Sequence, residues 1–465
     1  MKLRLVTALG VCIVLGSRAG AESLDGVWKT EGYGYVFEIN NNTLQAFEVT
    51  TRTCVPGFVA KSNGSSAPGR EATFRTSDGD VFFVRSGETG DHRRLHAEGS
   101  VSDMRIDRIP SVPAVCTPPT ANTPPDNFEV FTRTWAENYI SFDLKHTNWE
   151  QIVAENRNKV TPNTSPSELF NILSAMIKPF GDAHTGLDAP RLKRNFHGIR
   201  PGTDRVEIDT VGTADDDKFR DRGMSKLFAV TDRGYVRDRP LRRFCNDQLQ
   251  YGHLDRSTGY LRIVSFGGYS KQRGFAPGME ALQAALDQIF SDPALRALVI
   301  DVRINFGGDD PYGIEIASRL ATTEYLGYTK RARADTLDRN KWTAADASMV
   351  RPSSRPGFRG PVVELIGPFT ISAGETFTQA LMGRTPHVTR IGENTQGVFS
   401  DVLDRRLPNR WNFGLPNEVY LTAEGKAFDG VGIAPDITVP VFARADITAA
   451  KDPALVKAIE ILGKH

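Results

Sequence analysis

Residues 361–397 read PVVELIGPFTISAGETFTQALMGRTPHVTRIGENTQG, and this stretch decides the fold of the second half of the chain. The apolar run 362–366 predicts a short buried strand. After a Gly-Pro break, Phe377 and Leu381 recur at the spacing of one helix face, which predicts a helix. Ser372 therefore lies at the junction between a strand end and a helix start.

The position of Ser372 supports two interpretations. A serine at a helix N-terminus can act as a nucleophile, because backbone N–H groups and the helix dipole stabilise an oxyanion there. The same serine, with Glu375 three residues later, also forms a capping box that only closes the helix end. The rest of the chain must decide between the two.

The alternation of strands and helices begins at residue 259. The sequence predicts strands at 260–264 and 297–302, and amphipathic helices at 277–289 and 313–320. Strands that alternate with helices indicate an α/β domain with a parallel-biased sheet. In such a sheet, sites form in the loops at the carboxyl ends of the strands.

The first 21 residues have the pattern of a signal peptide. Lys2 and Arg4 precede the apolar run 5–15, and the small residues 19–21 suit a signal peptidase. The apolar run is too short to span a membrane stably, and no later run is long enough. We expect an exported protein without a stable membrane span, in the periplasm or secreted.

The remainder of the first half divides by composition. Short runs of β-forming residues separated by turn residues predict an antiparallel, barrel-like β domain at 22–112. A Pro-rich stretch at 113–125 reads as a linker. Aromatic and aliphatic residues at helical spacing predict a helical subdomain at 126–190, with the aromatic stripe in its core. Residues 191–258 show no periodicity and read as an irregular insertion. The α/β core then spans 259–445, and a C-terminal helix 446–465.

Three cysteines remain after signal cleavage. Cys54 lies inside the β domain and Cys116 just after it, and we expect these two to form a disulfide in an exported protein. Cys245 would then remain as a buried, inert thiol.

The composition of the chain excludes some classes of function. The chain has 465 residues, a net charge of +1 and 40% apolar residues, which describes a globular protein of several domains and argues against nucleic acid as its partner. No His-Glu-x-x-His or Cys-x-x-Cys zinc spacing occurs, so we expect neither a metal nor a cofactor.

Three separate turns together contain what acyl transfer needs. Residues 181–186 read GDAHTG and place His184 in a polar turn behind an apolar helix. Gly307 and Gly308 form a sharp turn after a predicted strand. With Ser372 these residues offer a base, free backbone N–H groups and a nucleophile. The Gly-x-Ser-x-Gly elbow of α/β-hydrolases is absent at Ser372.

Four ordered motifs now suggest a family. The segments 298–308, 370–375, 391–397 and 430–437 resemble those of the C-terminal-processing serine peptidases of family S41, the tail-specific and tricorn-core group. The resemblance covers roughly residues 126–440. It implies a catalytic domain of the ClpP/crotonase-like α/β type, with a helical lead-in and, in this chain, a separate N-terminal antiparallel β domain.

The resemblance also implies roles for single residues. Tail-specific members carry a catalytic lysine where this chain has Val398, and a PDZ domain for which residues 191–250 look too short. The chain therefore resembles the tricorn-like branch, which uses serine, histidine and a carboxylate. Ser372 matches the nucleophile, His184 the base, and Asp429 the carboxylate, in place of the more usual glutamate. Ala373 N–H and the N–H of Gly307 or Gly308 would form the oxyanion hole.

The predicted function is that of an exported serine peptidase acting on peptides or proteins. The alternative is a catalytically weak or inactive member of the same fold that binds a peptide or an apolar ligand. Intact Ser372 and His184 favour the first, whereas Asp429 and Ala183 leave room for the second. An adhesion or carbohydrate-binding role led by the β domain has no motif behind it. The sequence makes no prediction of oligomeric state.

Overall fold

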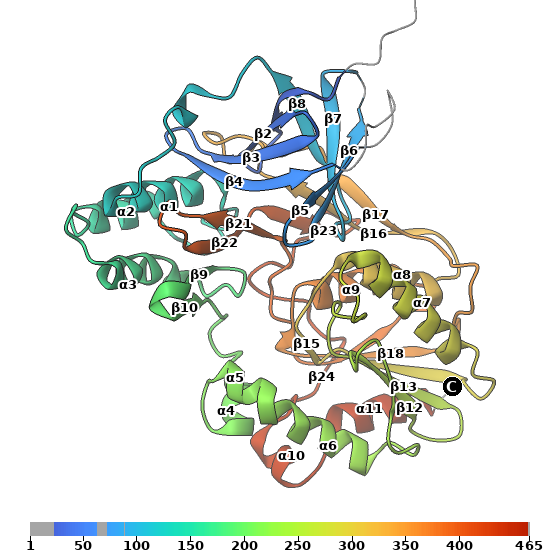
Figure 1. Cartoon of the computed structure of the whole chain (residues 1–465). Coiled ribbons are helices and arrows are strands. Elements are labelled where there is room, and N and C mark those ends of the chain that lie inside the picture. The colour runs from blue at the N-terminus through green and yellow to red at the C-terminus, as the bar shows by residue number, and fades with distance from the viewer. Residues whose placement is uncertain (1–22, 63–71, 88, 464–465) are drawn as a thin grey trace, which may run out of the picture.

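The computed structural model describes residues 23–62, 72–87 and 89–463, so the predicted signal peptide lies outside the described residues (Figure 1). Within this part of the chain a β-barrel stands beside a helical region, and both adjoin a larger α/β domain (Figure 1). No helix among the described residues is long and apolar enough to cross a bilayer.

The N-terminal domain is a closed antiparallel barrel, because β1 pairs with both β2 and β8. Trp28, Phe37, Leu44, Phe74 and Leu95 are almost fully buried in the barrel core. The predicted antiparallel β domain is thereby confirmed. The strands are β1 (Gly26–Thr30), β2 (Tyr35–Asn40), β3 (Thr43–Val49), β4 (Cys54–Lys61), β5 (Ala72–Thr76), β6 (Val81–Ser86), β7 (His92–Ala97) and β8 (Met104–Ile109).

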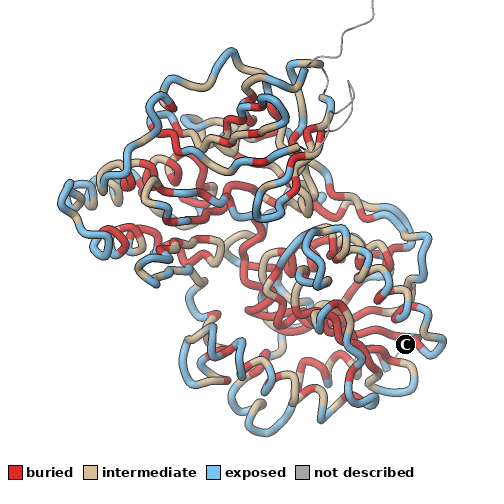
Figure 2. The backbone as a smooth tube through the Cα atoms, in the orientation of Figure 1, coloured by how far each residue is buried: buried red, intermediate tan, exposed pale blue. Residues whose placement is uncertain are grey.

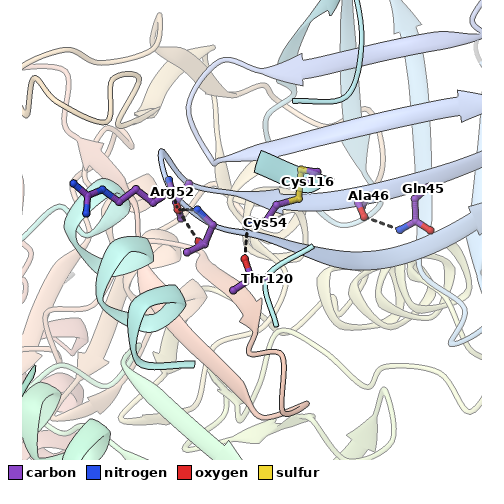
Figure 3. Close-up of a disulfide and its surroundings, with 8 residues drawn as sticks. Gln45, Ala46, Arg52, Cys54, Cys116 and Thr120 are labelled. Atoms are coloured by element: carbon purple, nitrogen blue, oxygen red, sulfur yellow. Dashed lines mark hydrogen bonds between the residues drawn. A yellow bond between two sulfur atoms is a disulfide. The ribbon is translucent and has the colours of Figure 1, made fainter. Parts of the chain in front are cut away.

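The predicted disulfide is present. Cys54 and Cys116 are joined by an S–S bond of 2.06 Å (Figure 3). Beside it, Cys54 N–H donates to Thr120 Oγ1 at 2.9 Å, and Thr120 N–H donates to the Cys54 carbonyl at 2.9 Å. The Pro-rich stretch 113–125 is therefore tied to the barrel and includes η1 (Ala114–Cys116), unlike a free linker. Cys245 is buried, and this burial raises the pKa of its thiol to about 12, so it stays protonated and inert.

Replacing Cys54 by serine should lower the free energy of unfolding by about 2–4 kcal/mol, since the bond closes a loop of 62 residues and constrains the unfolded chain. Chemical denaturation of the variant and of the wild type measures this change. Cys245→Ser is the matched control, since Cys245 takes no part in a disulfide. Dithiothreitol should reproduce the effect in the wild type and in Cys245→Ser, and should add nothing in Cys54→Ser. Equal stability of Cys54→Ser and the wild type would contradict the prediction.

The helical region packs around an aromatic core. Trp135, Tyr139, Phe142, Trp149 and Phe180 form a cluster of rings with centroid separations of 4.8–5.9 Å. This confirms the predicted core role of the aromatic stripe. The elements are α1 (Pro124–Asn138), α2 (Trp149–Arg157), α3 (Pro166–Ile177), η2 (Lys178–Phe180), β9 (Gly186–Ala189), η3 (Pro190–Leu192) and β10 (Arg194–His197).

Residues 191–258 are more regular than the sequence suggested. They contain β10, the helical segments α4 (Arg205–Val211), α5 (Asp216–Lys218), η4 (Phe219–Gly223) and α6 (Met224–Gly234), and the strands β11 (Arg242–Phe244) and β12 (Leu249–His253). The helical segments bury few apolar side chains, among them Phe219 and Leu227, against residues of the α/β domain. Such a narrow apolar stripe among many charges leaves a weak periodic signal.

The α/β domain is built on a mixed sheet with the order β11-β12-β13-β14-β18-β20-β24. The strands β13 (Thr258–Ile263), β14 (Ala297–Asp301), β18 (Val362–Ile366), β20 (Thr389–Gly392) and β24 (Ile437–Thr438) are parallel, whereas β11 and β12 are antiparallel additions at one edge. The predicted strands and the parallel bias are therefore confirmed.

Helices cover both faces of this sheet, and Figure 2 shows the buried backbone concentrated there. Leu298 and Ile300 of β14 pack with α7 (Phe275–Phe290), α8 (Asp310–Leu320) and α9 (Ala373–Leu381) on one face. Val299 packs with α11 (Pro453–Leu462) on the other. The alternation along β14 follows from the two-residue period of a strand.

The strands β21 to β23 return to the barrel side of the molecule before β24 completes the main sheet (Figure 1). β21 (Val402–Arg406) and β22 (Asn412–Pro416) join β9 and β10 in one sheet, and β23 (Glu418–Leu421) pairs with β16 (Tyr325–Ala332), which also pairs with β17 (Asp346–Val350). The chain therefore crosses between domains repeatedly. The remaining short elements are β15 (Ile304–Asn305), β19 (Phe369–Thr370) and α10 (Arg444–Thr448).

Candidate active site

Ser372 stands at a strained turn between β19 and α9. Its backbone angles are φ 56° and ψ −121°, whereas an ordinary N-cap residue has an extended backbone. A non-glycine residue in this region costs of order 1–3 kcal/mol and persists only where its surroundings impose it. The backbone of Ser372 therefore differs from that of an ordinary helix cap.

The glycine turn lies directly against Ser372. A Cβ on Gly307 would come within 2.7 Å of Ser372 Cβ, and a Cβ on Gly308 would come within 2.2 Å of the Phe266 carbonyl oxygen. Both glycines have positive φ, so no other residue fits this turn without strain. The structure thus brings the predicted turn and Ser372 together.

Two backbone donors at this junction are free. Gly307 N–H donates to Asn305 Oδ1 at 2.9 Å and is already used. Within residues 23–62, 72–87 and 89–463, neither Gly308 N–H nor Ala373 N–H donates to another protein group. Of the predicted oxyanion donors, Gly308 and Ala373 are therefore available.

Glu375 holds the serine turn to the segment after β20. Its carboxylate is fully buried and accepts from Ser372 N–H at 3.3 Å, Gly397 N–H at 2.6 Å and Val398 N–H at 2.8 Å. Burial raises the pKa of Glu375 to about 7, although these hydrogen bonds oppose the shift. A residue that the sequence marked only as a cap partner is thus central to the site.

His184 is positioned by its own turn. His184 N–H donates to Asp182 Oδ1 at 2.9 Å, and Thr185 Oγ1 donates to the Asp182 carbonyl at 2.7 Å. Burial lowers the pKa of His184, while Asp182, Asp401 and the Ser400 backbone oppose that shift. The imidazole is neutral at neutral pH, as a general base must be.

Asp429 lies on the turn before β24. Its Oδ1 accepts weakly from Phe399 N–H at 3.5 Å, and burial, followed by the nearby Asp182 charge, raises the pKa of this carboxyl to about 7. Asp429 Oδ2 and His184 Nδ1 are both buried without a hydrogen-bond partner in the described part of the chain. Among the described residues, no direct hydrogen bond joins Ser372, His184 and Asp429 to one another.

One short segment touches every part of the site. Val398 N–H donates to Glu375, Phe399 N–H to Asp429, and the Ser400 backbone contacts His184. The next residue, Asp401, also influences His184 electrostatically. The sequence singled out Val398 only as the place of the lysine of tail-specific members, and the contacts of 398–401 depend on packing among distant elements. Asp182 differs from this segment, because its position two residues before His184 is a local signal that it could contact the histidine.

The groups at this junction suit nucleophilic acyl transfer, since they include a strained serine at a helix N-terminus, a neutral histidine and two free N–H groups. In the residues that the structure describes, no group of three or more His, Cys, Asp or Glu side chains could hold a metal ion.

Stability should fall as the pH rises from about 5 to 7. Burial raises the pKa values of Glu364, Glu375 and Glu418 to about 7 in the folded protein, above their ordinary values. The folded state therefore binds more protons than the unfolded state between about pH 4.5 and 7, and ionising these groups costs free energy. We expect the free energy of unfolding to fall by at least about 1 kcal/mol over this interval. The thermal unfolding midpoint, measured against pH, should fall with it.

Glu364→Gln tests this assignment, because Glu364 accepts from Thr378 Oγ1 and lies on β18, outside the candidate site. This variant should show a shallower decline between pH 5 and 7. A midpoint that rises over the same interval in the wild type would contradict the prediction.

The comparisons with known proteins agree with this geometry. Residues 257–439 match the model of peptidase family S41, and residues 120–178 match that of the tricorn protease C1 domain. Residues 257–439 form a peptidase family S41 domain. This confirms the family suggested by the four motifs. No curated protein sequence matches the chain.

Solved structures share the fold of the S41 domain and its helical lead-in. A candidate peptidase from Parabacteroides merdae ATCC 43184 has 23% identity and a TM-score of 0.56, over 73% of this chain and 97% of that one. Mature CPAF complexed with lactacystin has 12% identity and a TM-score of 0.53, over 73% of this chain and 98% of that one. At these identities the likeness shows the fold alone. The predicted α/β catalytic fold is thereby confirmed.

Proposed function

We propose that the chain is a serine peptidase in which Ser372 attacks the carbonyl carbon of a peptide bond. The observation that carries this proposal is the strained Ser372 turn against the Gly307-Gly308 turn, with two unused N–H donors beside it. His184 takes the Ser372 hydroxyl proton as the new C–O bond forms. Gly308 N–H and Ala373 N–H then stabilise the oxyanion, to which each donor contributes about 3 kcal/mol.

The second half of the reaction uses the same groups. His184 gives its proton to the leaving amine as the C–N bond breaks, which leaves an acyl ester on Ser372. His184 then takes a proton from the water that attacks the ester, and returns it to Ser372 Oγ as the ester C–O bond breaks and the carboxylic acid product leaves.

We assign Asp429 the role of orienting His184. Its Oδ2 and His184 Nδ1 are both buried without a hydrogen-bond partner among the described residues, and a bridging water would satisfy both. Because aspartate is one methylene shorter than the glutamate usual in the family, an indirect link of this kind suits its length.

The chain is further proposed to act outside the cytoplasm, in the periplasm or after secretion. The signal-like residues 1–21 and the Cys54–Cys116 disulfide support this location. Its substrates are accordingly peptides or proteins of that compartment.

Labelling with a fluorophosphonate probe tests the activated serine. The wild-type protein should be labelled, with the adduct mapped to Ser372 by peptide mass analysis, and both Ser372→Ala and His184→Ala should lose the label. Folding of each variant is checked by its thermal midpoint. A folded wild-type protein that does not react would count against catalysis and would favour the ligand-binding alternative.

A further inference from the structure

A cavity of about 280 Å³ opens where the mouth of the barrel meets the S41 domain. Tyr35, Phe37, Phe58 and Phe82 form its aromatic wall, and the Phe58 and Phe82 rings stack at 4.7 Å. Stacked rings present faces that are attractive to cations as well as to apolar groups. The charges on the opposite wall indicate which of these two kinds of ligand the cavity binds.

The opposite wall carries buried charge from the S41 domain. Lys330 Nζ donates to Asp401 Oδ2 at 2.5 Å and contacts Glu418 Oε1 at 3.2 Å. Lys330 and Glu418 are each only 3% exposed in their side chains, whereas Asp401 is 53% exposed because it faces the cavity. Two carboxylates thus share one ammonium group, and Asp404 adds a third carboxyl to the lining of the cavity. This wall favours a cationic group over an apolar or anionic one.

Asn417 adds an unused donor to the same cavity. This residue is 2% exposed, lines the cavity, and has a buried Nδ2 without an acceptor among the described residues. A buried donor left unpaired costs free energy, so a ligand that brings an acceptor oxygen gains by filling this place. A peptide supplies such oxygens along its backbone.

The cavity lies next to the candidate catalytic groups. Asp401 is three residues beyond Val398, whose N–H donates to Glu375, and three residues of extended chain span at most about 10 Å. Asp401 also acts on His184 electrostatically. A peptide with its carbonyl at Ser372 can therefore reach the cavity with a neighbouring side chain.

We propose that this cavity is a specificity pocket that binds a lysine or arginine side chain of the substrate, close to the bond to be cut. The aliphatic stem of the side chain lies along the Phe58 and Phe82 rings, and its charged end reaches the exposed Asp401 carboxylate. The assignment of the bound molecule as a substrate rests on the proposed peptidase function.

Binding of peptides to the full-length Ser372→Ala protein tests the pocket without requiring catalysis. The probes are fluorescein-labelled Gly/Ala octapeptides with one lysine at each position in turn, and a matched series with norleucine, which keeps the stem but lacks the charge. Fluorescence polarisation gives the dissociation constants. We expect lysine to tighten binding about tenfold over norleucine at one position.

Phe58→Leu in the same background should remove most of this preference. Phe83→Leu, a phenylalanine of the same strand β6 as Phe82 that does not line the cavity, should keep it. Should Phe58→Leu not fold, the lysine and norleucine series still decides the matter in the unaltered pocket.

The outcomes separate this inference from the proposed function. Equal binding of lysine and norleucine at every position would overturn the pocket, as would a lysine preference that survives in folded Phe58→Leu. If the wild type cuts the peptides without any lysine preference, the peptidase function stands and the pocket is wrong. If lysine peptides bind selectively and none is cut, the pocket stands as a ligand site and the peptidase function is wrong.

Discussion

Replacing Ser372 by alanine should lower peptide hydrolysis by about 10⁴-fold or more and leave the fold intact. In the proposed mechanism the Ser372 hydroxyl forms the acyl bond, and the alanine side chain has no oxygen to attack with. The packing around it hardly changes, because Ala loses only the hydroxyl. Hydrolysis of a quenched fluorescent peptide measures the effect.

Two further serine variants sharpen this test. Ser291→Ala, at the exposed end of α7, should keep full activity. Ser372→Gly should be as inactive as Ser372→Ala but about 1 kcal/mol more stable, because glycine accepts the φ of 56° without strain. Substantial hydrolysis by Ser372→Ala would show that another residue is the nucleophile.

Replacing Arg303 by methionine should lower the free energy of unfolding by about 3–5 kcal/mol. The Arg303 guanidinium donates to Asp301 Oδ2 at 2.6 Å and to Asp452 Oδ1 at 2.7 Å, and all three side chains are buried. Without the arginine, two carboxylates remain buried and uncompensated. Asp452 also caps α11 through Leu455 N–H, so the loss should loosen the C-terminal helix. Urea denaturation measures the change.

Removing one of the two remaining carboxylate charges should partly rescue this variant. Asp452→Asn in the Arg303→Met background should recover part of the lost stability, because it removes one of the two stranded charges. Arg355→Met, which breaks a solvent-exposed pair with Asp287, should cost at most about 1 kcal/mol. An Arg303→Met loss no larger than that of Arg355→Met would contradict the prediction.

The same ion network should respond to acid. Burial alone would raise the pKa of Asp301, but the Arg303 charge and hydrogen bonds lower it below the ordinary value. Its stabilising contribution is therefore present above the unfolded pKa of about 4 and is lost as the pH falls further. Asp301 and Arg303 thus form a structural ion pair.

The barrel gains a role in the proposed function from its position. It contributes the aromatic wall of the cavity, while the S41 domain contributes the charged wall. Tyr33, in the loop between β1 and β2, donates to Glu418 Oε1 at 2.7 Å and so links the two domains at that cavity. The barrel is thus placed to select substrates for the catalytic groups beside it.

The sequence by itself determined the elements and the local turns. Short runs of β-forming residues between turn residues predicted the barrel domain. Helical spacing predicted α7, α8 and α9, because this period reflects which face of a helix is buried. The Gly-Gly turn at 307–308 and the serine at a strand-to-helix junction could also be predicted, because both depend on residues that are adjacent in the sequence. The pairing of Cys54 with Cys116 followed from the small number of candidates in an exported chain.

Only the tertiary structure decided how these parts act together. Glu375 became the link between Ser372 and the 397–398 segment, and Asp401 became a neighbour of His184, through contacts between residues far apart in the chain. The segment 191–258 has regular structure because its few apolar side chains pack against strands that are distant in the sequence. Residue spacing shows which face of an element is buried. It does not show which elements pack against each other, and the site and its cavity form between such elements.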